Sequence, residues 1–195
     1  MPIFVDHDER RKKIVDAAIR VLGDVGFAKF TLRAVSNRLG GSVTMVTHYF
    51  PSREALLDRM LAQTLEDAQA MQEELIAIAD PHERLEAVLR YFLPIDEESL
   101  GIERARVALV SHRTTAPAIE RHLAILEPRM RNLITTAISD FISPDQIAST
   151  VDLIRVWTSG VVLSTVEHPE MWTPDRQDAA LKHFMKLIDL PVTTR

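Results

Sequence analysis

The sequence predicts an all-α protein, and two patterns carry the prediction. Apolar residues recur three and four positions apart along most of the 195-residue chain, which is the period of a helix that buries one face. No stretch alternates polar and apolar residues between turn signals, as a half-buried strand does. We therefore expect about nine helices and no sheet, with a small basic head that leads into a larger body.

The head begins with a long helix and a short one. The long helix is expected from about Asp8 to Val25, where Gly26 can close it, because glycine adopts the left-handed conformation that ends many helices. Thr31 suits the N-cap of a short helix that ends near Leu39, since its hydroxyl can accept a hydrogen bond from a free N–H of the first turn.

A second short helix follows a glycine break. Gly40 and Gly41 end the preceding helix, and Ser42 can cap a new one that runs through Tyr49. Two helices too short to be stable alone must cross at a steep angle and pack on the longer helix before them, which is helix-turn-helix geometry. The outer face of the second helix would then face the major groove of a duplex. On periodicity alone, a plain helical hairpin in a bundle stays an alternative.

The body continues as a series of capped helices. Ser52 precedes a long helix to about Ala79, and proline or acidic residues mark the starts of those that follow. Pro128 lies inside one pattern and should kink or divide that helix, because proline removes one backbone hydrogen bond and its ring crowds the preceding turn. The later helices are expected at about 81–93, from the acidic residues 96–98 through Val110, and at about 118–141, 144–168 and 174–190.

Charge is distributed unevenly between the two parts. The chain carries a net charge of −5, yet residues 1–53 hold nine Lys/Arg against five Asp/Glu. In an acidic protein whose first quarter is basic, we expect only that quarter to bind a polyanion such as DNA. The alternative is that these cations only form a solvated face.

Several other classes of protein are disfavoured. The chain has no cysteine, no glycine-rich phosphate loop and no nucleophile elbow, so we expect neither an enzyme nor a cofactor. His82 and Glu86 have helical spacing but lack a third ligand, so no metal site is expected. The first thirteen residues are charged and no run of eighteen apolar residues occurs. We therefore expect a cytoplasmic protein without a membrane span or signal peptide.

The segment from Arg10 to Leu57 resembles the N-terminal domain of the TetR family of bacterial transcriptional regulators. The resemblance lies in five motifs that follow one another without a gap: Ile14-Val-x-Ala-Ala18, Gly26-Phe27, Thr31-Leu32-x-x-Val35, Leu39-Gly40-x-Ser42 and His48-Tyr-Phe-Pro-Ser-Arg-Glu-Ala-Leu56. It implies a three-helix DNA-binding domain at residues 1–52 and a helical ligand-binding and dimerisation domain at 53–195. The string Thr47 to Phe50 is also similar to the Ser-His-Tyr-Phe of regulators of glycine betaine synthesis, although four residues assign no ligand.

The expected DNA-contacting residues come from the helix faces and from this resemblance. Thr44, Met45, Thr47 and His48 lie on the outer face of the second short helix, and Thr47 stands where the family most often has tyrosine. Gly41 replaces the usual small apolar residue of the turn. Phosphate contacts are expected from the capped helix starts and from flanking side chains, namely Thr31, Arg33, Ser42, Tyr49 and Arg53.

The body is expected to hold a dimer interface and a ligand pocket. The interface would use apolar residues of the last two helices, with an internal core as the alternative; these are Trp157, Val161, Leu181, Phe184 and Ile188. The pocket would use methionine, aromatic and polar residues that are individually more typical of core or surface. Its candidates are Met60, Met71, Tyr91, Phe92, Arg104, His112 and Trp157, with Gln63, Arg106 and Met130 beside them. His122 and His183 are interpreted as exposed polar residues.

Together these observations predict a homodimeric transcriptional regulator, a repressor that a small molecule releases from operator DNA. The sign of control and the release by a ligand are what the family resemblance implies. The alternative is a helical adaptor that binds a protein partner, for which the basic head would be incidental.

Overall fold

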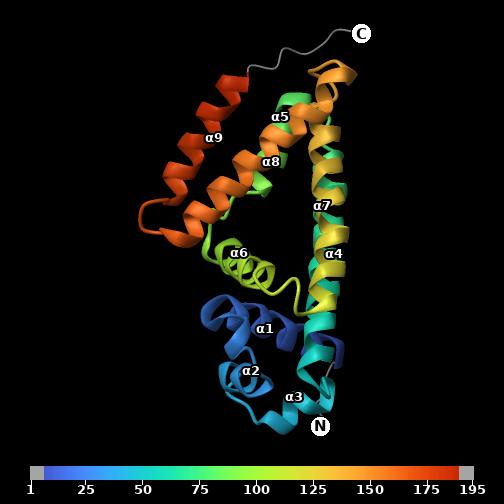
Figure 1. The fold of residues 1–195 in the computed structure, drawn as a ribbon, viewed down its shortest axis with the longest axis vertical. Coiled ribbons are helices and arrows are strands. Elements are labelled where there is room, and N and C mark those ends of the chain that lie inside the picture. The colour runs from blue at the N-terminus through green and yellow to red at the C-terminus, as the bar shows by residue number, and fades with distance from the viewer. Residues whose placement is uncertain (1–6, 189–195) are drawn as a thin grey trace, which may run out of the picture. The chain divides into compact units, whose positions relative to one another are not determined.

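The computed structural model describes residues 7–188, which fold into nine α-helices without a strand (Figure 1). The all-α prediction is therefore confirmed for this part of the chain. The helices are α1 (His7–Lys29), α2 (Leu32–Arg38), α3 (Val43–Tyr49), α4 (Arg53–Ile76), α5 (Pro81–Tyr91), α6 (Glu97–Val110), α7 (Pro117–Ile138), α8 (Pro144–Glu167) and α9 (Pro174–Ile188).

The chain forms two compact units. Unit 1 combines Met1–Glu66 with Gly101–His122, and unit 2 combines Asp67–Leu100 with Leu123–Arg195. The helices α1, α2 and α3 thus share their unit with most of α6, while α4 and α7 each contribute to both units. The boundary expected after residue 52 is a division by function and stays a prediction.

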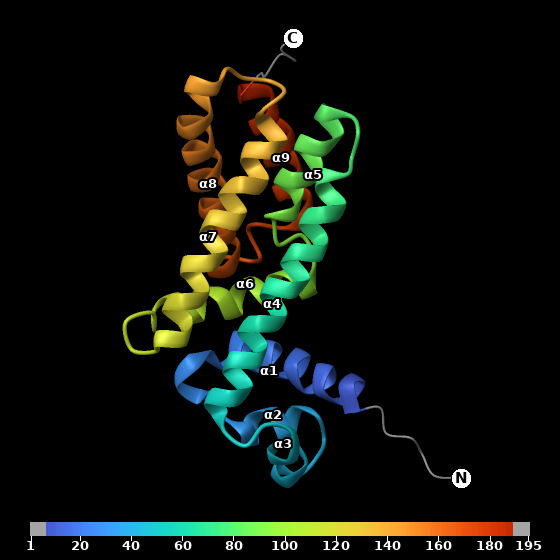
Figure 2. The ribbon, with the colours of Figure 1, turned by 90° about the vertical axis from the view of Figure 1, so that its right-hand side faces the viewer.

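In unit 1, α2 packs on α1 and α3 packs on α2 (Figure 2). The buried face of α1 consists of apolar residues at helical spacing: Ile14, Val15, Ala17, Ala18, Val21 and Leu22. Gly26 has a φ of 74°, so regular helical geometry is interrupted there, as the sequence predicts, before a last short stretch that ends at Lys29. Val35 of α2 and Val46 of α3 are fully buried, which fixes both helices by their inner faces.

Both short helices begin at the expected caps. The Thr31 hydroxyl accepts a hydrogen bond from the Ala34 N–H at 3.1 Å, and the Ser42 hydroxyl accepts one from the Met45 N–H at 3.2 Å. Each cap satisfies one of the N–H groups that a helix start leaves without an intrahelical partner. Gly40 makes the turn between them with a φ of 64°, a conformation that other residues rarely adopt.

A close approach between α1 and α6 also lies within unit 1. A β-carbon built on Gly23 would lie 2.8 Å from the carbonyl oxygen of Gly101 and 3.4 Å from the backbone nitrogen of Ala105. The two backbones can come this close only because residue 23 has no side chain. This position is therefore a place where α6 is fitted tightly to the helix that supports α2 and α3.

Unit 2 has its own apolar core, to which α5, α7, α8 and α9 contribute. Figure 1 shows α8 running beside α9. The rings of Trp157, from α8, and Phe184, from α9, stack with their centroids 4.0 Å apart. Arg90 of α5 donates to Asp178 of α9 at 2.6 Å. Gln177 donates to the carbonyls of Pro94 and Trp172 at 3.0 Å each, so it ties two loops together.

The helix α7 is continuous through Pro128, so of the two expected outcomes, a kink or a division, the division is wrong and the kink stays a prediction. One missing backbone bond does not outweigh the packing of the buried α7 residues on the core. The predicted end of α9 near Leu190 lies outside the described residues. Among the described helices, α8 alone is long and apolar enough to cross a membrane, at a mean hydropathy of 1.2, which is weak evidence for a span.

Candidate nucleic-acid interface

The exposed face of α3 presents two of the expected groove-facing residues. Thr44 and His48 are exposed, one helical turn apart, while Val46 on the opposite face is fully buried. The Thr47 hydroxyl is bonded to the Thr44 carbonyl at 3.1 Å, so it is turned back onto its own helix. The His48 ring meets Tyr49 edge-on with centroids 5.1 Å apart, which supports an imidazole that is itself open to solvent.

Met45 has a more constrained position than the sequence suggests. Its sulfur accepts a hydrogen bond from Arg10 of α1 at 3.3 Å. A β-carbon on Gly41 would lie 2.6 Å from the Met45 methyl group, so the side chain covers the turn between α2 and α3. The missing side chain at position 41 thus leaves the space in which Met45 lies.

The expected phosphate-binding groups have different surroundings. Thr31, Arg33 and Ser42 are exposed at the starts of α2 and α3. Their position leaves backbone N–H groups and one guanidinium open to an anion in solution. Tyr49 is half-buried, and its hydroxyl lies 3.1 Å from Nδ1 of His7.

Arg53 does not have the surroundings of a free phosphate anchor. Its Nε donates to the Phe30 carbonyl and its Nη2 to the Phe27 carbonyl, both at 2.7 Å, and its guanidinium lies 4.2 Å from the centre of the Phe27 ring. In this structure the charge of Arg53 thus binds the chain between α1 and α2 to the start of α4. The sequence gives no sign of these bonds because the carbonyls lie 23 and 26 positions away.

Two residues of the head were missed by reasoning from the sequence. His7 and Arg10 lie at the start of α1, and their side chains reach Tyr49 and Met45 of α3. Their basic character is visible in the sequence, but their contact with α3 depends on how α1 crosses it. The start of α1 therefore adjoins the expected DNA-reading helix.

The expected pocket residues divide between the two units. Met60, Arg104 and His112 belong to unit 1, and the His112 ring lies 4.5 Å from that of Phe27. The others belong to unit 2, where Trp157 is stacked on Phe184. These other residues are Met71, which is exposed, Phe92, which is buried, and Tyr91, which is half-buried and packed against Phe92.

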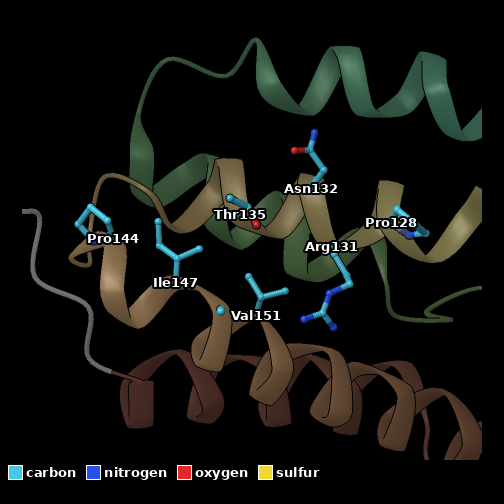
Figure 3. A pocket seen from close by; sticks show the side chains of 8 residues that line it. Pro128, Arg131, Asn132, Thr135, Pro144, Ile147 and Val151 are labelled. Atoms are coloured by element: carbon cyan, nitrogen blue, oxygen red, sulfur yellow. The ribbon is translucent and has the colours of Figure 1, made fainter.

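A hollow described in unit 2 lies elsewhere, between α7 and α8, with a volume of about 520 Å³ (Figure 3). None of the expected pocket residues lines it. Its lining residues are Pro128, Arg131, Asn132, Thr135, Pro144, Ile147, Ala148 and Val151. Arg131 is ion-paired with Asp152, so its charge is already neutralised there. The assignment of a pocket to the expected residues stays a prediction.

The interpretation of His122 as an exposed residue is wrong. The residue is 7% exposed, and its Nδ1 has no hydrogen-bond partner in the described part of the chain. Burial lowers the pKa of His122, although a hydrogen bond with the Leu61 backbone opposes this effect. The sequence could not reveal this burial, because one polar residue in an amphipathic helix is normally placed outside. His183 is exposed, as expected.

The face of α8 and α9 expected at a dimer interface is largely internal. Val161 and Leu181 are 4% and 0% exposed within the single chain, so they have no surface to offer a partner. Trp157, Phe184 and Ile188 are half-buried against the same core. The exposed apolar residues of these helices are instead Leu153, Val156, Leu163 and Leu187. Because α8 is apolar on more than one face, its sequence pattern did not distinguish core from surface.

Comparison with protein families gives two matches. Residues 14–60 match the family of bacterial regulatory proteins known as the tetR family. Residues 81–189, more than half of the chain, match the C-terminal domain of BetI-type transcriptional repressors. Neither match supports the alternative of a helical adaptor.

Individual relatives agree with these families. The HTH-type transcriptional regulator BetI of Rhizobium meliloti strain 1021 is 33% identical over 127 residues, which span 63% of this chain and 61% of that protein. The corresponding regulator of Agrobacterium fabrum is 27% identical over 140 residues, which span 71% and 68% of the two chains. The aligned part thus covers less than two thirds of the first relative.

Solved structures share the fold. A transcriptional regulator from Saccharomonospora viridis in complex with choline has a TM-score of 0.79 at 19% identity, over 92% of this chain and 96% of that one. A transcriptional regulator from Rhodococcus sp. Rha1 has a TM-score of 0.77 at 20% identity, over 91% and 95%. With the family matches over residues 14–60 and 81–189, these findings show that the chain belongs to the TetR family of bacterial transcriptional regulators, with a C-terminal domain of the BetI type.

Proposed function

We propose that this protein is a cytoplasmic repressor that binds an operator duplex as a homodimer and releases it when a small organic cation binds in the body. The observation that carries the proposal is the capped pair α2 and α3 in a basic segment, with Thr44 and His48 exposed on the outer face of α3. This arrangement offers base-reading side chains and phosphate-binding helix starts on one surface.

In the proposed complex α3 enters the major groove. The His48 imidazole and the Thr44 hydroxyl can each donate to or accept from base edges, which differ among all four base pairs in this groove. The starts of α2 and α3, with Arg33 beside them, bind phosphates and set the position of the head on the duplex. Affinity should therefore fall as salt rises, because bound phosphates release counterions.

The proposed dimer uses the exposed faces of α8 and α9. Leu153 and Val156 are 68% and 73% exposed, and Leu163 follows on the same side of α8 at helical spacing. Leu187 is exposed on α9. A second copy of the chain is the occupant we propose, because a two-fold dimer can place two heads on successive major grooves about 34 Å apart.

The proposed effector is a small organic cation, choline being the first probe. The choline complex of the Saccharomonospora viridis regulator, whose fold this chain shares, supports this class. Another structural neighbour, the multidrug binding protein EbrR with malachite green, also holds an organic cation; its TM-score is 0.62 at 21% identity. Unit 2 carries aromatic side chains, which attract cations through their ring faces.

The experiment for the effector is a titration with choline and with its neutral carbon analogue, 3,3-dimethylbutan-1-ol, followed by thermal shift. Choline should stabilise the protein and the analogue should not. Choline should also bind less tightly when DNA is present, by the same factor by which it weakens DNA binding. Equal affinity with and without DNA would mean that the site does not control DNA binding.

The experiment for DNA binding uses fluorescence anisotropy with fragments of the intergenic DNA next to the gene, at several salt concentrations. We expect tight binding to one fragment, with log affinity falling by about 0.9 per log unit of salt for each phosphate bound. Failure to bind any duplex at low salt would refute the proposed function.

A further inference from the structure

The start of α1 lies against the helix that we propose to read DNA. Nη2 of Arg10 donates to the Met45 sulfur at 3.3 Å, and Nδ1 of His7 lies 3.1 Å from the Tyr49 hydroxyl. Met45 and Tyr49 lie on α3 one helical turn apart. Two separate contacts, both within unit 1, thus hold the first turn of α1 against α3 at two points one helical turn apart.

The first two turns of α1 carry a concentrated positive charge. Residues 8–13 read Asp-Glu-Arg-Arg-Lys-Lys, so four cations stand against two carboxylates. Arg11 pairs with Asp8 at 3.7 Å, and Lys13 pairs with Glu9 at 2.5 Å. Both carboxylates therefore have a cation of their own on the same helix.

The contact with Met45 does not neutralise the positive charge of Arg10. A thioether sulfur is a neutral and weak acceptor, whereas a guanidinium has five N–H donors in a planar fork that matches phosphate oxygens. The Met45 sulfur thus orients the Arg10 side chain without neutralising its positive charge. Arg10 is a cation held at the side of α3.

From these observations we propose that Arg10 binds a DNA backbone phosphate at the edge of the major groove that α3 enters, making the start of α1 a second DNA-contacting element. The inference rests on the proposed function, since it requires α3 to lie in a groove. The groove is about 12 Å wide, and its walls are lined by phosphates. A side chain that touches the flank of α3 at Met45 therefore faces a wall rather than the base edges.

The contact with Met45 gives Arg10 a second consequence. Methionine is unbranched and flexible, so without a partner it would sample many positions in the groove. The guanidinium restrains the sulfur, and a phosphate bound to Arg10 would restrain both. Arg10 is thus both a phosphate contact and a positioning residue for Met45.

The test compares Arg10→Gln with Arg20→Gln in the full-length protein. Both changes remove one positive charge from α1, but residue 20 is exposed and lies about 15 Å further along the helix axis. Arg10→Gln should weaken binding to both operator and scrambled duplexes, and should reduce the salt slope by about 0.9 per head, or about 1.8 per dimer. Arg20→Gln should leave the slope unchanged, and Arg10→Lys should retain it because the charge stays.

Phosphate-ethylation interference provides the second readout. In the unsubstituted protein, ethylation of specific phosphates on each side of the groove should block binding, and with Arg10→Gln one of these phosphates per half-site should cease to matter. An unchanged interference pattern and slope for Arg10→Gln, or an equal decrease in slope for Arg20→Gln, would overturn this inference while the proposed function stands. Absence of duplex binding by the unsubstituted protein would overturn both.

Discussion

The guanidinium of Arg53 lies 4.2 Å from the centre of the Phe27 ring and donates to the carbonyls of Phe27, in the last turn of α1, and of Phe30, in the segment between α1 and α2. The same ring is contacted by His112, 4.5 Å away at its centroid. One aromatic side chain therefore links the end of α1, the start of α4 and the chain after α6 within unit 1. The position of α2 and α3 depends on this link, because α2 packs on α1 and α3 packs on α2.

Replacing Arg53 with alanine should destabilise the protein. The change removes two hydrogen bonds from a charged donor and a cation–π contact, at a cost of about 2–3 kcal/mol after allowance for partial exposure. The control is Arg33→Ala, which removes an exposed charge and should change stability by less than about 0.5 kcal/mol while weakening DNA binding. Urea unfolding measures both. Equal stability of the two variants would show that the Arg53 contacts contribute little.

The close approach of α1 and α6 gives a prediction at Gly23. Alanine usually stabilises a helix interior relative to glycine, but a β-carbon at this position would lie 2.8 Å from a backbone oxygen. We expect Gly23→Ala to destabilise by about 1–3 kcal/mol, as overpacking does.

The matched control is Gly101→Ala, on the other side of the same contact. A β-carbon there meets nothing within 4 Å, so this variant should be stabilised by about 0.5–1 kcal/mol. Thermal unfolding should move the two midpoints in opposite directions. A rise in midpoint for Gly23→Ala would contradict the close packing.

Buried His122 predicts a dependence of stability on pH. Burial lowers its pKa below the ordinary value of 6.5, so the unfolded chain takes up a proton at a higher pH than the folded chain does. This contribution to stability is fully present above about pH 6.5 and is lost as the pH falls from there toward the folded pKa. His122→Gln should lessen the loss of stability below pH 6.5, and the exposed control His183→Gln should not. Unfolding curves from pH 5 to 8 measure the difference, and parallel curves for all three proteins would contradict it.

The proposed dimer predicts different outcomes for two substitutions on the last helices. Val156 is 73% exposed, so Val156→Asp should leave the chain folded but give monomers. Leu181→Asp places a carboxylate in the core of unit 2 and should unfold the protein instead. Ile125→Asp, at an exposed position of α7, is the control for charge alone. Sedimentation velocity distinguishes these outcomes, and a Val156→Asp dimer would place the interface elsewhere.

The sequence predicted the features of the head that depend on nearby residues. Thr31 and Ser42 act on N–H groups three positions away, and Gly40 makes a turn within one short segment, so a local pattern contains the whole interaction. The contacts of Arg53 and of Arg10 with Met45 join residues 23 to 35 positions apart. No local pattern specifies such pairs.

The faces of the body helices show a different limit. The apolar residues of α8 occupy both a core-facing and an exposed side, so helical periodicity could not assign Val161 to the core and Val156 to the surface. His122 shows the converse case, in which a polar residue lies on a buried face. The burial of the α8 residues and of His122 depends on which helices pack around them. The sequence of a single helix does not contain this information.

The central claim is that α3 reads DNA through His48, and selection from a randomised duplex library tests it most directly. The unsubstituted protein should enrich a pseudo-palindromic sequence, because a two-fold dimer reads two related half-sites. His48→Ala should still bind DNA but show no preference at one symmetric pair of positions, since discrimination of about 1–3 kcal/mol at each of these bases depends on the imidazole. Failure to enrich any sequence, or the same preference at every position for both proteins, would contradict the account.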